Sequence, residues 1–266
     1  MSRARHARQL VLEDIGVDGQ RRLAAARVAV VGCGGLGAPV IQQLVAAGVG
    51  HLTLCDDDSI EVSNLNRQTQ FRADQLGLRK AAAAAAFARA LDPDVDVVAR
   101  VQRITVPAAR ALFAEHDVVV DCSDGFPTKY LLNDVAVVTD TPLVHGAATA
   151  WAGQVLVVPG RSGPCLRCLF PTLPAANTVP TCRTAGIVAP VVGVVGSLQA
   201  AEVIKLVVGM ADLRGRLLAV DVKAGSTRTL QFDRDRRCPC CGDGVDHTTI
   251  AVRDDDYAMT TCEDDQ

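Results

Sequence analysis

The chain has 266 residues, of which 49% are hydrophobic, and its 27 basic and 30 acidic residues give a net charge of −3. This length and apolar content suffice for a full hydrophobic core and exclude a chain that is disordered throughout. The near-neutral charge and an aromatic content of only 3% argue against a nucleic-acid-binding protein, which needs a basic surface or stacking platforms.

The N-terminus and the apolar segments predict a cytoplasmic protein without a membrane span. The opening MSRARHARQLVLEDIG contains no apolar region of the kind found in signal peptides. The longest apolar stretch, residues 187–198, is interrupted by Pro190, Gly193 and Gly196 and is too short to cross a bilayer. We therefore expect a reducing compartment, in which the ten cysteines do not form disulfides.

Strands and helices are predicted to alternate along the first 146 residues. The predicted strands are residues 27–31, 51–55, 95–101, 117–120 and 142–146. The predicted helices between them are residues 38–47, 76–91, 107–115 and 130–139. This alternation is typical of an α/β protein with a doubly wound, Rossmann-like sheet.

The regular alternation of strands and helices ends in the second half of the chain. A short strand at 155–158 is followed by a long loop rich in Pro, Gly and Cys up to residue 185. A helix near 198–208 and strand-like pieces up to residue 232 complete the pattern. We interpret these elements as additional strands that extend the same sheet, with one long functional loop.

The charge is concentrated at the C-terminus. Residues 243–266 contain eight acidic residues and one basic residue, so the tail carries −7 and the remainder of the chain +4. We expect one domain, residues 1–242, followed by an acidic and disordered tail, residues 243–266.

A glycine-rich turn, GCGGLG at 32–37, connects the first predicted strand to its helix. Gly32, Gly34 and Gly37 match the G-x-G-x-x-G pattern, and Asp56 follows the next strand where a carboxylate can bind a ribose. Glycines allow close backbone approach, and a helix N-terminus offers unpaired N–H groups, so the turn predicts a phosphate site. The alternative is a turn that only permits tight packing.

The polar residues after this unit favour a nucleoside triphosphate with a metal. Lysine supplies a point charge for phosphate, arginine can bind two oxygens at once, and an aspartate at the end of a strand suits Mg²⁺. Singly, each would be an ordinary surface charge. The residues of this kind are Asp56, Asp57 and Asp58, the run SNLNRQ at 63–68, Lys80, and DCSD at 121–124.

Two C-x₂-C pairs predict a structural zinc site. Cys165 and Cys168 are separated from Cys238 and Cys241 by 69 residues, so a tetrahedral Zn²⁺ would attach the C-terminal part to the long loop. Cys240 offers an alternative thiolate, although the spacing favours Cys238 with Cys241.

Together these motifs resemble the ThiF/MoeB/HesA family, the bacterial relatives of ubiquitin-activating enzymes. The resemblance extends from about residue 8 to residue 242 and also includes Arg8-Gln9-Leu10 and GVVGSLQAAEVIK at 193–205. It implies a MgATP-dependent enzyme that adenylylates the C-terminal glycine of a small ubiquitin-like sulfur carrier ending in Gly-Gly, of the ThiS or MoaD type, and releases pyrophosphate. It also implies a homodimer.

The resemblance assigns roles to individual residues. Arg8 would reach the triphosphate of the other subunit, and Asp124 would coordinate Mg²⁺. Family members commonly carry Asn where this chain has Gly125, so only the backbone can act there, while Thr128 and Lys129 offer polar groups nearby. The residues expected to act in catalysis are Arg8, Arg67, Lys80, Asp124 and Cys182. Those expected to bind the nucleotide are Gly32, Gly34, Gly35, Gly37, Asp56, Asp58, Ser63, Asn64, Arg67, Lys80, Asp124 and Gly125.

The segment CRTAG at 182–186 resembles the ThiF form of this loop, whose cysteine can link covalently to the activated carrier. An ordinary loop thiol is an equal alternative, since adenylylation needs no nucleophilic cysteine. The segment favours a thiamin pathway, while molybdopterin synthesis and secondary metabolism stay open. No rhodanese-like domain fits after residue 242, so we expect a separate protein to donate sulfur.

Two other functions are compatible with parts of the pattern. An NAD-dependent dehydrogenase would use the same glycine turn but would leave Arg67, Lys80 and Asp124 without a role. A non-catalytic binder of a ubiquitin-like partner would have no need for the phosphate-site residues.

Overall fold

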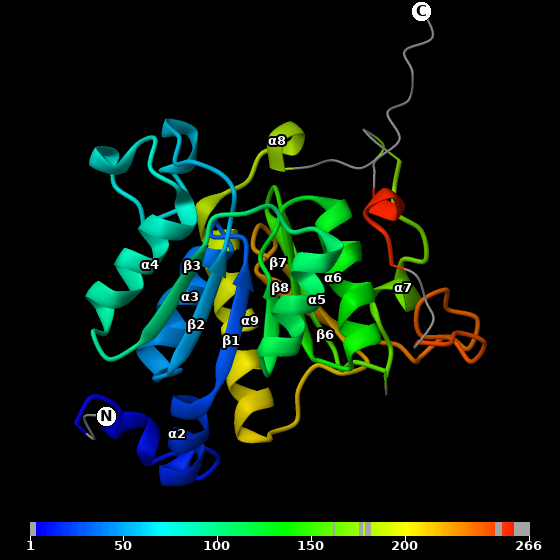
Figure 1. The fold of residues 1–266 in the computed structure, drawn as a ribbon, viewed down its shortest axis with the longest axis horizontal. Helices are drawn as coiled ribbons and strands as arrows, with labels where there is room; N and C mark the ends of the chain where they lie inside the picture. Colours follow the sequence, from blue (N-terminus) through cyan, green and yellow to red (C-terminus); the bar gives the residue numbers. More distant parts are fainter. Residues whose placement is uncertain (1–3, 162, 176–177, 179–181, 248–251, 258–266) are drawn as a thin grey trace, which may run out of the picture.

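One eight-stranded sheet organises the chain in the computed structural model (Figure 1). The structure describes residues 4–161, 163–175, 178, 182–247 and 252–257. The strands are β1 (Arg27–Val31), β2 (His51–Cys55), β3 (Asp96–Arg100), β4 (Val118–Asp121), β5 (Leu143–Thr149), β6 (Ala152–Val158), β7 (Arg216–Asp221) and β8 (Ser226–Gln231). Their order in the sheet is β3-β2-β1-β4-β5-β6-β7-β8.

The sheet consists of a parallel part and an antiparallel extension. Strands β3, β2, β1, β4 and β5 are parallel to one another. Strand β6 pairs antiparallel with β5, and β7 and β8 follow it with antiparallel pairing. The predicted doubly wound sheet with additional strands is therefore confirmed. Successive strands run outward from β1 on one side and from β4 on the other, which makes the carboxyl ends of β1 and β4 the expected ligand site of this architecture.

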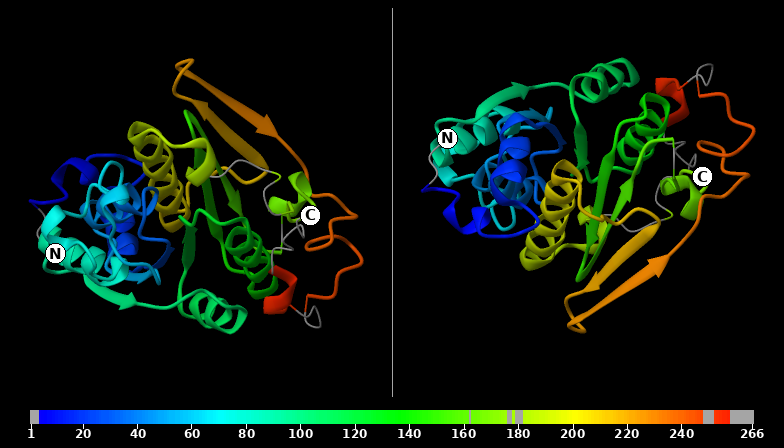
Figure 2. Two further views of the ribbon diagram at one scale, coloured as in Figure 1. Left: turned by 90° about the horizontal axis from the view of Figure 1, so that it is seen from above. Right: turned by 90° about the horizontal axis from the view of Figure 1, so that it is seen from below.

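Helices cover both faces of the sheet. They are α1 (Ala7–Leu10), α2 (Gly16–Ala25), α3 (Gly37–Ala47), α4 (Lys80–Leu91), α5 (Val106–Glu115), α6 (Phe126–Thr139), α7 (Leu166–Leu169), α8 (Cys182–Ala185) and α9 (Ala189–Val208). Short 3₁₀ turns are η1 (Val62–Asn64), η2 (Ala73–Gln75) and η3 (Asp254–Tyr257). In Figure 2, the yellow α9 and the green α6 lie on opposite faces of the sheet.

Each face has its own hydrophobic core. In β1, Val28 and Val30 belong to the core beneath α3, α4 and α9, while Ala29 and Val31 belong to the core beneath α5 and α6. All four side chains are buried, as expected for a parallel strand that is covered on both sides.

Helix α9 begins nine residues before the predicted start at residue 198. Pro190 is tolerated because it occupies the first turn, where its missing N–H costs no hydrogen bond. Gly196 is required by packing, since a Cβ there would lie 2.4 Å from Cγ of Pro39 and 2.6 Å from the carbonyl oxygen of Leu36. Helices α9 and α3 therefore approach closely at Gly196, where the sequence suggests a break in the helix.

Helix α9 is also long and apolar enough to cross a membrane when judged by length and composition alone, with a mean hydropathy of 1.8. Half of that window is buried inside the molecule, where α9 packs against α3, β5 and β6. Two of its buried polar side chains form internal hydrogen bonds: Gln199 with the backbone of β4 and β5, and Glu202 with the N–H of Leu213. Core packing thus accounts for its apolar composition.

Helix α4 begins at Lys80, four residues after the predicted start at 76. Gly77 has a φ of +82°, which ends any helical path. Residues 77–79 instead pair with the segment before them: Ile60 donates its N–H to the carbonyl of Leu78, and Ser59 forms a β-bridge with Arg79.

Part of the acidic tail packs against α5 and α6. Asp254–Tyr257 form η3, which is the red turn in Figure 1. Asp254 accepts a hydrogen bond from the first N–H of α5, at Val106. The buried Tyr257 donates to Oδ2 of Asp134 at 2.7 Å. The tail was expected to be disordered, and this segment differs because one aromatic residue and one capping carboxylate find partners on the domain.

We expect Tyr257→Phe to lower the free energy of unfolding by about 1–2 kcal/mol, because a hydrogen bond to a buried carboxylate is lost while the ring still packs. Urea denaturation of the two proteins measures the difference. An unchanged free energy would show that the hydroxyl does not hold the tail on α6.

Candidate active site

The glycine turn passes closely beneath the end of β4. Gly32 has a φ of +95°, and a Cβ there would lie 2.6 Å from the carbonyl oxygen of Cys122. A Cβ on Gly37 would lie 2.2 Å from the carbonyl oxygen of Gly32. Only glycine fits these two positions, so the turn brings the N-terminus of α3 to the carboxyl ends of β1 and β4.

A cavity of about 980 Å³ opens at these strand ends and extends across the antiparallel part of the sheet. At one end it is lined by eight of the predicted residues, namely Gly32, Gly34, Gly35, Asp56, Asp58, Arg67, Lys80 and Asp124. Its other end is lined by polar residues of β5 to β8, among them Thr149, Gln154, Asp221, Ser226 and Arg228. This second half could not be predicted from the sequence, because it depends on the register of β6, β7 and β8.

Several predicted residues lie outside the cavity lining. Gly37 lies beneath the turn, and Asn64 is buried with its side-chain oxygen accepting from the N–H of Glu61. Ser63 donates to the carboxylate of Glu61, and Gly125 is the N-cap of α6. Arg8 is exposed on α1, which packs against α2, and it does not belong to the cavity lining.

Asp56 fastens the turn to the end of β2. Its carboxylate accepts hydrogen bonds from the N–H of Cys33 at 2.7 Å and from the N–H of Asp58 at 2.9 Å. Burial raises the pKa of Asp56 above its ordinary value, against the effect of the two N–H donors and of Lys80. The carboxylate therefore has a structural role in addition to any contact with a ligand.

The two predicted cations differ in how they are held. Lys80 is buried and forms an ion pair with Asp58 at 2.7 Å. Arg67 donates only to neutral oxygens, the carbonyl of Ser63 and the side chain of Asn66, and makes no ion pair within the described part of the chain. Its guanidinium is thus available for an anion in the cavity.

Asp124 presents an exposed carboxylate at the cavity wall. Among the described residues it makes no salt bridge, and it lies close to the buried Asp121 in sequence. An exposed carboxylate at a strand end fits a cation that keeps most of its water.

A polar network surrounds the buried Asp121 at the cavity wall, where Ser123, Lys129 and His145 belong to the lining. Asp121 is fully buried, and its Oδ2 accepts from Nζ of Lys129 at 3.1 Å and from Nδ1 of His145 at 2.8 Å. Its Oδ1 accepts from the N–H and the hydroxyl of Ser123 at 3.0 and 2.6 Å. The sequence points to DCSD, whose first aspartate ends a strand of buried valines, and to Lys129, but not to His145.

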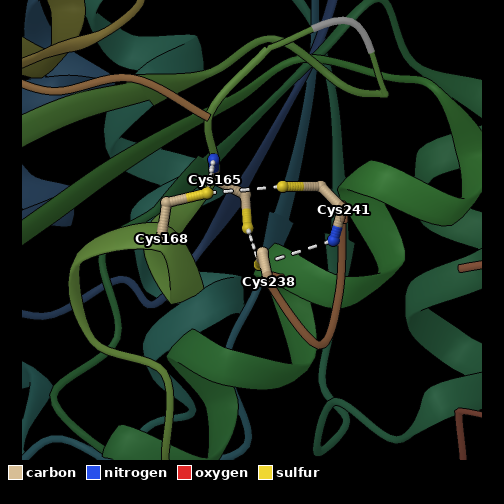
Figure 3. A group of neighbouring side chains, drawn as sticks. All are labelled: Cys165, Cys168, Cys238 and Cys241. Carbon is tan, nitrogen blue, oxygen red and sulfur yellow. Dashed lines mark hydrogen bonds between the residues drawn. The ribbon is translucent and has the colours of Figure 1, made fainter. Parts of the chain in front are cut away.

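The four predicted cysteines lie together (Figure 3). Their sulfur atoms all lie within 4.8 Å of one another, with Cys165–Cys238 at 3.6 Å and Cys168–Cys241 at 3.4 Å. Tetrahedral Zn²⁺ with Zn–S bonds of about 2.3 Å requires sulfur atoms roughly 3.8 Å apart. The cluster is consistent with a zinc site.

Backbone N–H groups surround these sulfurs. Sγ of Cys238 accepts from the N–H groups of Cys240 and Cys241, and Sγ of Cys168 accepts from that of Asp235. The Cys240 thiol lies outside the group of four and accepts from the side chain of Asn133. The structure therefore places Cys238 and Cys241 together, as the spacing favoured.

The cysteine cluster also holds one wall of the cavity. Arg167, between two of the cysteines, forms two hydrogen bonds of 2.7 Å with Asp134 and lies 4.8 Å from the ring centre of Tyr130. The Tyr130 hydroxyl donates to the carbonyl oxygens of Phe170 and Thr172, and both residues line the cavity.

Cys182 begins helix α8, but its side chain lies outside the described residues, as does that of Arg183. The predicted covalent role of Cys182 therefore stays a prediction.

Comparison with known proteins gives a family match over most of the chain. The model of the ThiF family matches residues 6–240. The chain is 46% identical to the SAMP-activating enzyme E1 of Haloferax volcanii over 256 residues, which is 95% of this chain and 93% of that protein. It is 46% identical to the sulfur carrier protein adenylyltransferase of Thermus thermophilus over 245 residues, which is 90% of each chain.

Two further similarities are partial or remote. The chain is 46% identical to the adenylyltransferase and sulfurtransferase MOCS3 of Sus scrofa, covering 90% of this chain but only 53% of that protein. Among solved structures, E. coli MccB with ATP shares the fold with a TM-score of 0.79 at 22% identity, covering 90% of this chain and 75% of that chain.

Proposed function

Because the chain belongs to the ThiF family, as its motifs predicted, we propose that the cavity binds MgATP and the C-terminal tail of a small ubiquitin-like sulfur carrier. The protein is a sulfur carrier protein adenylyltransferase that joins AMP to the carboxylate of the carrier's terminal glycine. One observation supports this assignment of the site most strongly. The same cavity has glycines and cations suited to phosphate at one end and is lined by strands β5 to β8 at the other.

The reaction needs alignment more than proton transfer. A terminal carboxylate is ionised at neutral pH, so its oxygen can attack the α-phosphorus directly. A bond forms between this oxygen and phosphorus, the bond to the β-phosphate oxygen breaks, and pyrophosphate leaves with the electron pair. The protein must hold two anions together in line and stabilise the charge that develops on pyrophosphate.

The nucleotide end of the cavity supplies groups of the required kind. Gly34 and Gly35 expose backbone at the N-terminus of α3, where the helix dipole favours phosphate. Asp56, Arg67 and Lys80 line this end of the cavity. Asp56 would accept the ribose hydroxyls, and Arg67 and Lys80 would supply positive charge for the phosphates. In this proposal Arg67 contributes the more available charge, because Lys80 already pairs with Asp58.

Asp124 would hold Mg²⁺ when MgATP binds. Its exposed carboxylate without an ion pair among the described residues fits a hydrated divalent cation. The bound cation would neutralise charge on the phosphates as pyrophosphate leaves.

The other end of the cavity would hold the carrier tail. Gly153 and Ala219 keep the sheet surface low there, and Arg228 adds a cation that makes no ion pair in the described ranges. An extended Gly-Gly terminus, which has no side chains, fits such a shallow channel leading to the glycine turn.

We propose that a homodimer completes the site. Arg8 is exposed and does not line the cavity of its own chain, so in this proposal it contacts phosphate in the partner's site. Val11, Leu12 and Val17, which follow it in sequence, are exposed at 77%, 51% and 45%, as expected for a surface that another subunit covers.

We expect Arg67→Ala and Lys80→Ala each to lower carrier-dependent exchange of pyrophosphate into ATP by at least about 100-fold, because each removes charge beside the phosphates. Arg72→Ala and Lys223→Ala, which change exposed residues outside the cavity, should retain the wild-type rate. Exchange of labelled pyrophosphate measures the effect, and normal exchange in both cavity variants would place the phosphates elsewhere.

The four-cysteine cluster would bind one Zn²⁺ per chain and attach the C-terminal segment to the cavity wall. We expect metal analysis of the purified protein to give about one zinc per chain. Cys238→Ser should lose the metal and stability, whereas Cys240→Ser should retain both, since Cys240 lies outside the group of four. A stable wild-type protein without zinc would contradict this assignment.

Adenylylation itself does not require Cys182. We therefore expect Cys182→Ser to keep wild-type pyrophosphate exchange, measured in the same assay. Incubation of the wild-type protein with carrier and MgATP then separates the two roles left open for this residue. A dithiothreitol-sensitive adduct that Cys182→Ser cannot form assigns a covalent role, and its absence identifies an ordinary loop thiol.

A further inference from the structure

Strand β4 ends before its neighbour β5, and side chains supply hydrogen bonds to the part of β5 that extends beyond β4. The register of the pair stops at Asp121 with His145, while β5 continues to Thr149. The carbonyl of Gly146 thus has no partner from β4, and Nζ of Lys129 donates to it at 2.6 Å. Lys129 therefore takes the place of a strand neighbour and at the same time pairs with Asp121.

Asp121 joins five parts of the fold at this point. Besides its bonds to Lys129 of α6 and His145 of β5, its backbone carbonyl accepts from Gln199 of α9 at 2.8 Å. Gly146 allows this approach, since a Cβ there would lie 2.3 Å from the Gln199 side chain. The remaining carboxylate oxygen of Asp121 holds the N–H and the hydroxyl of Ser123.

The charge state of the network agrees with its geometry. Lys129, His145 and Ser123 hold the pKa of Asp121 well below its usual range despite its burial. Burial lowers the pKa of His145, so a neutral imidazole donates its Nδ1 proton to the carboxylate. Every acceptor of Asp121 is therefore occupied by a fixed donor, and the turn that follows β4 has little freedom.

Resting on the function proposed above, we propose that His145 and Lys129 are positioning residues that act through Asp121 to set the place of Ser123 and Asp124 for the cation of MgATP. Both residues line the cavity, and both donate to Asp121, so the role proposed for them requires no contact with the nucleotide. Removal of the His145 donor leaves Oδ2 of Asp121 held by Lys129 alone, so the carboxylate can rotate. This rotation loosens the turn that Oδ1 holds at Ser123 and displaces the Asp124 carboxylate from the cation. The structure thus assigns a role in cation affinity to two residues that act on the cation only through Asp121 and the turn after it.

The test is a Mg²⁺ titration of binding of α,β-methylene-ATP to the full chain, followed by calorimetry. His145→Leu removes the donor, and we expect the Mg²⁺ concentration at half-saturation to rise about tenfold, as for the loss of other groups that orient metal ligands. His145→Asn keeps a donor at the position of Nδ1 and should stay within about threefold of the wild type. Lys129→Gln is a second variant of the network and should shift in the same direction as His145→Leu.

His116→Leu is the matched control. His116 is also buried, with hydrogen bonds to Leu112 and Thr53, but it does not line the cavity. Its loss should lower the melting temperature without changing the Mg²⁺ dependence. In turnover assays, His145→Leu should recover most of its kcat at high Mg²⁺ while the KM for the carrier stays unchanged.

Two results would overturn the inference. One is a Mg²⁺ concentration at half-saturation equal to that of the wild type, measured in a folded His145→Leu or Lys129→Gln variant. The other is an equal shift in His116→Leu, which would show general destabilisation. If the wild-type protein itself shows no Mg²⁺-dependent nucleotide binding, the proposed function fails instead.

Discussion

The ion pair between Asp121 and Lys129 is the constraint on which the arrangement of the site depends. A buried carboxylate is tolerated only when its oxygens are occupied by donors, and a buried ion pair that loses one partner destabilises a protein by about 3–5 kcal/mol. Here the donors come from the next turn, from α6 and from β5, so the charge can be buried only if these parts are correctly assembled. The same interaction thus ties the nucleotide end of the cavity to the sheet extension.

The cysteine cluster imposes a second constraint at the other side of the cavity. It joins segments 69 residues apart in sequence, and its neighbour Arg167 binds Asp134 of α6, the helix that also carries Lys129. Tyr257 of the tail reaches the same carboxylate. Helix α6 is therefore held by two ion pairs, Lys129 with Asp121 and Asp134 with Arg167. Because Arg167 lies between two of the cysteines, the loop that follows it along the cavity is tied to the cysteine cluster.

Much of this organisation could be predicted from the sequence, where local chemistry leaves few choices. The structure has a strand at 27–31 followed by the tight glycine turn, as predicted. It also brings the two cysteine pairs together, as their spacing predicted. The start of α9 could not be predicted, because Gly193 and Gly196 indicate a break unless the close approach of α3 is known. The role of His145 depends on which strand lies beside β4 and in which register, and a single sequence gives no measure of either.

The distribution of charge in the cavity supports the proposal that a metal ion accompanies the nucleotide. Lys80 and Lys129 are each paired with an aspartate, so their charge is largely neutralised within the protein. The cavity cations without an ion pair in the described parts of the chain are Arg67 at the nucleotide end and Arg228 at the sheet end. One guanidinium cannot balance a triphosphate that meets a carboxylate, because the two substrates together carry about five negative charges. In the proposed function, a divalent cation at Asp124 would supply the missing positive charge where the two anions meet, so the protein has to fix the position of the Asp124 carboxylate before MgATP binds.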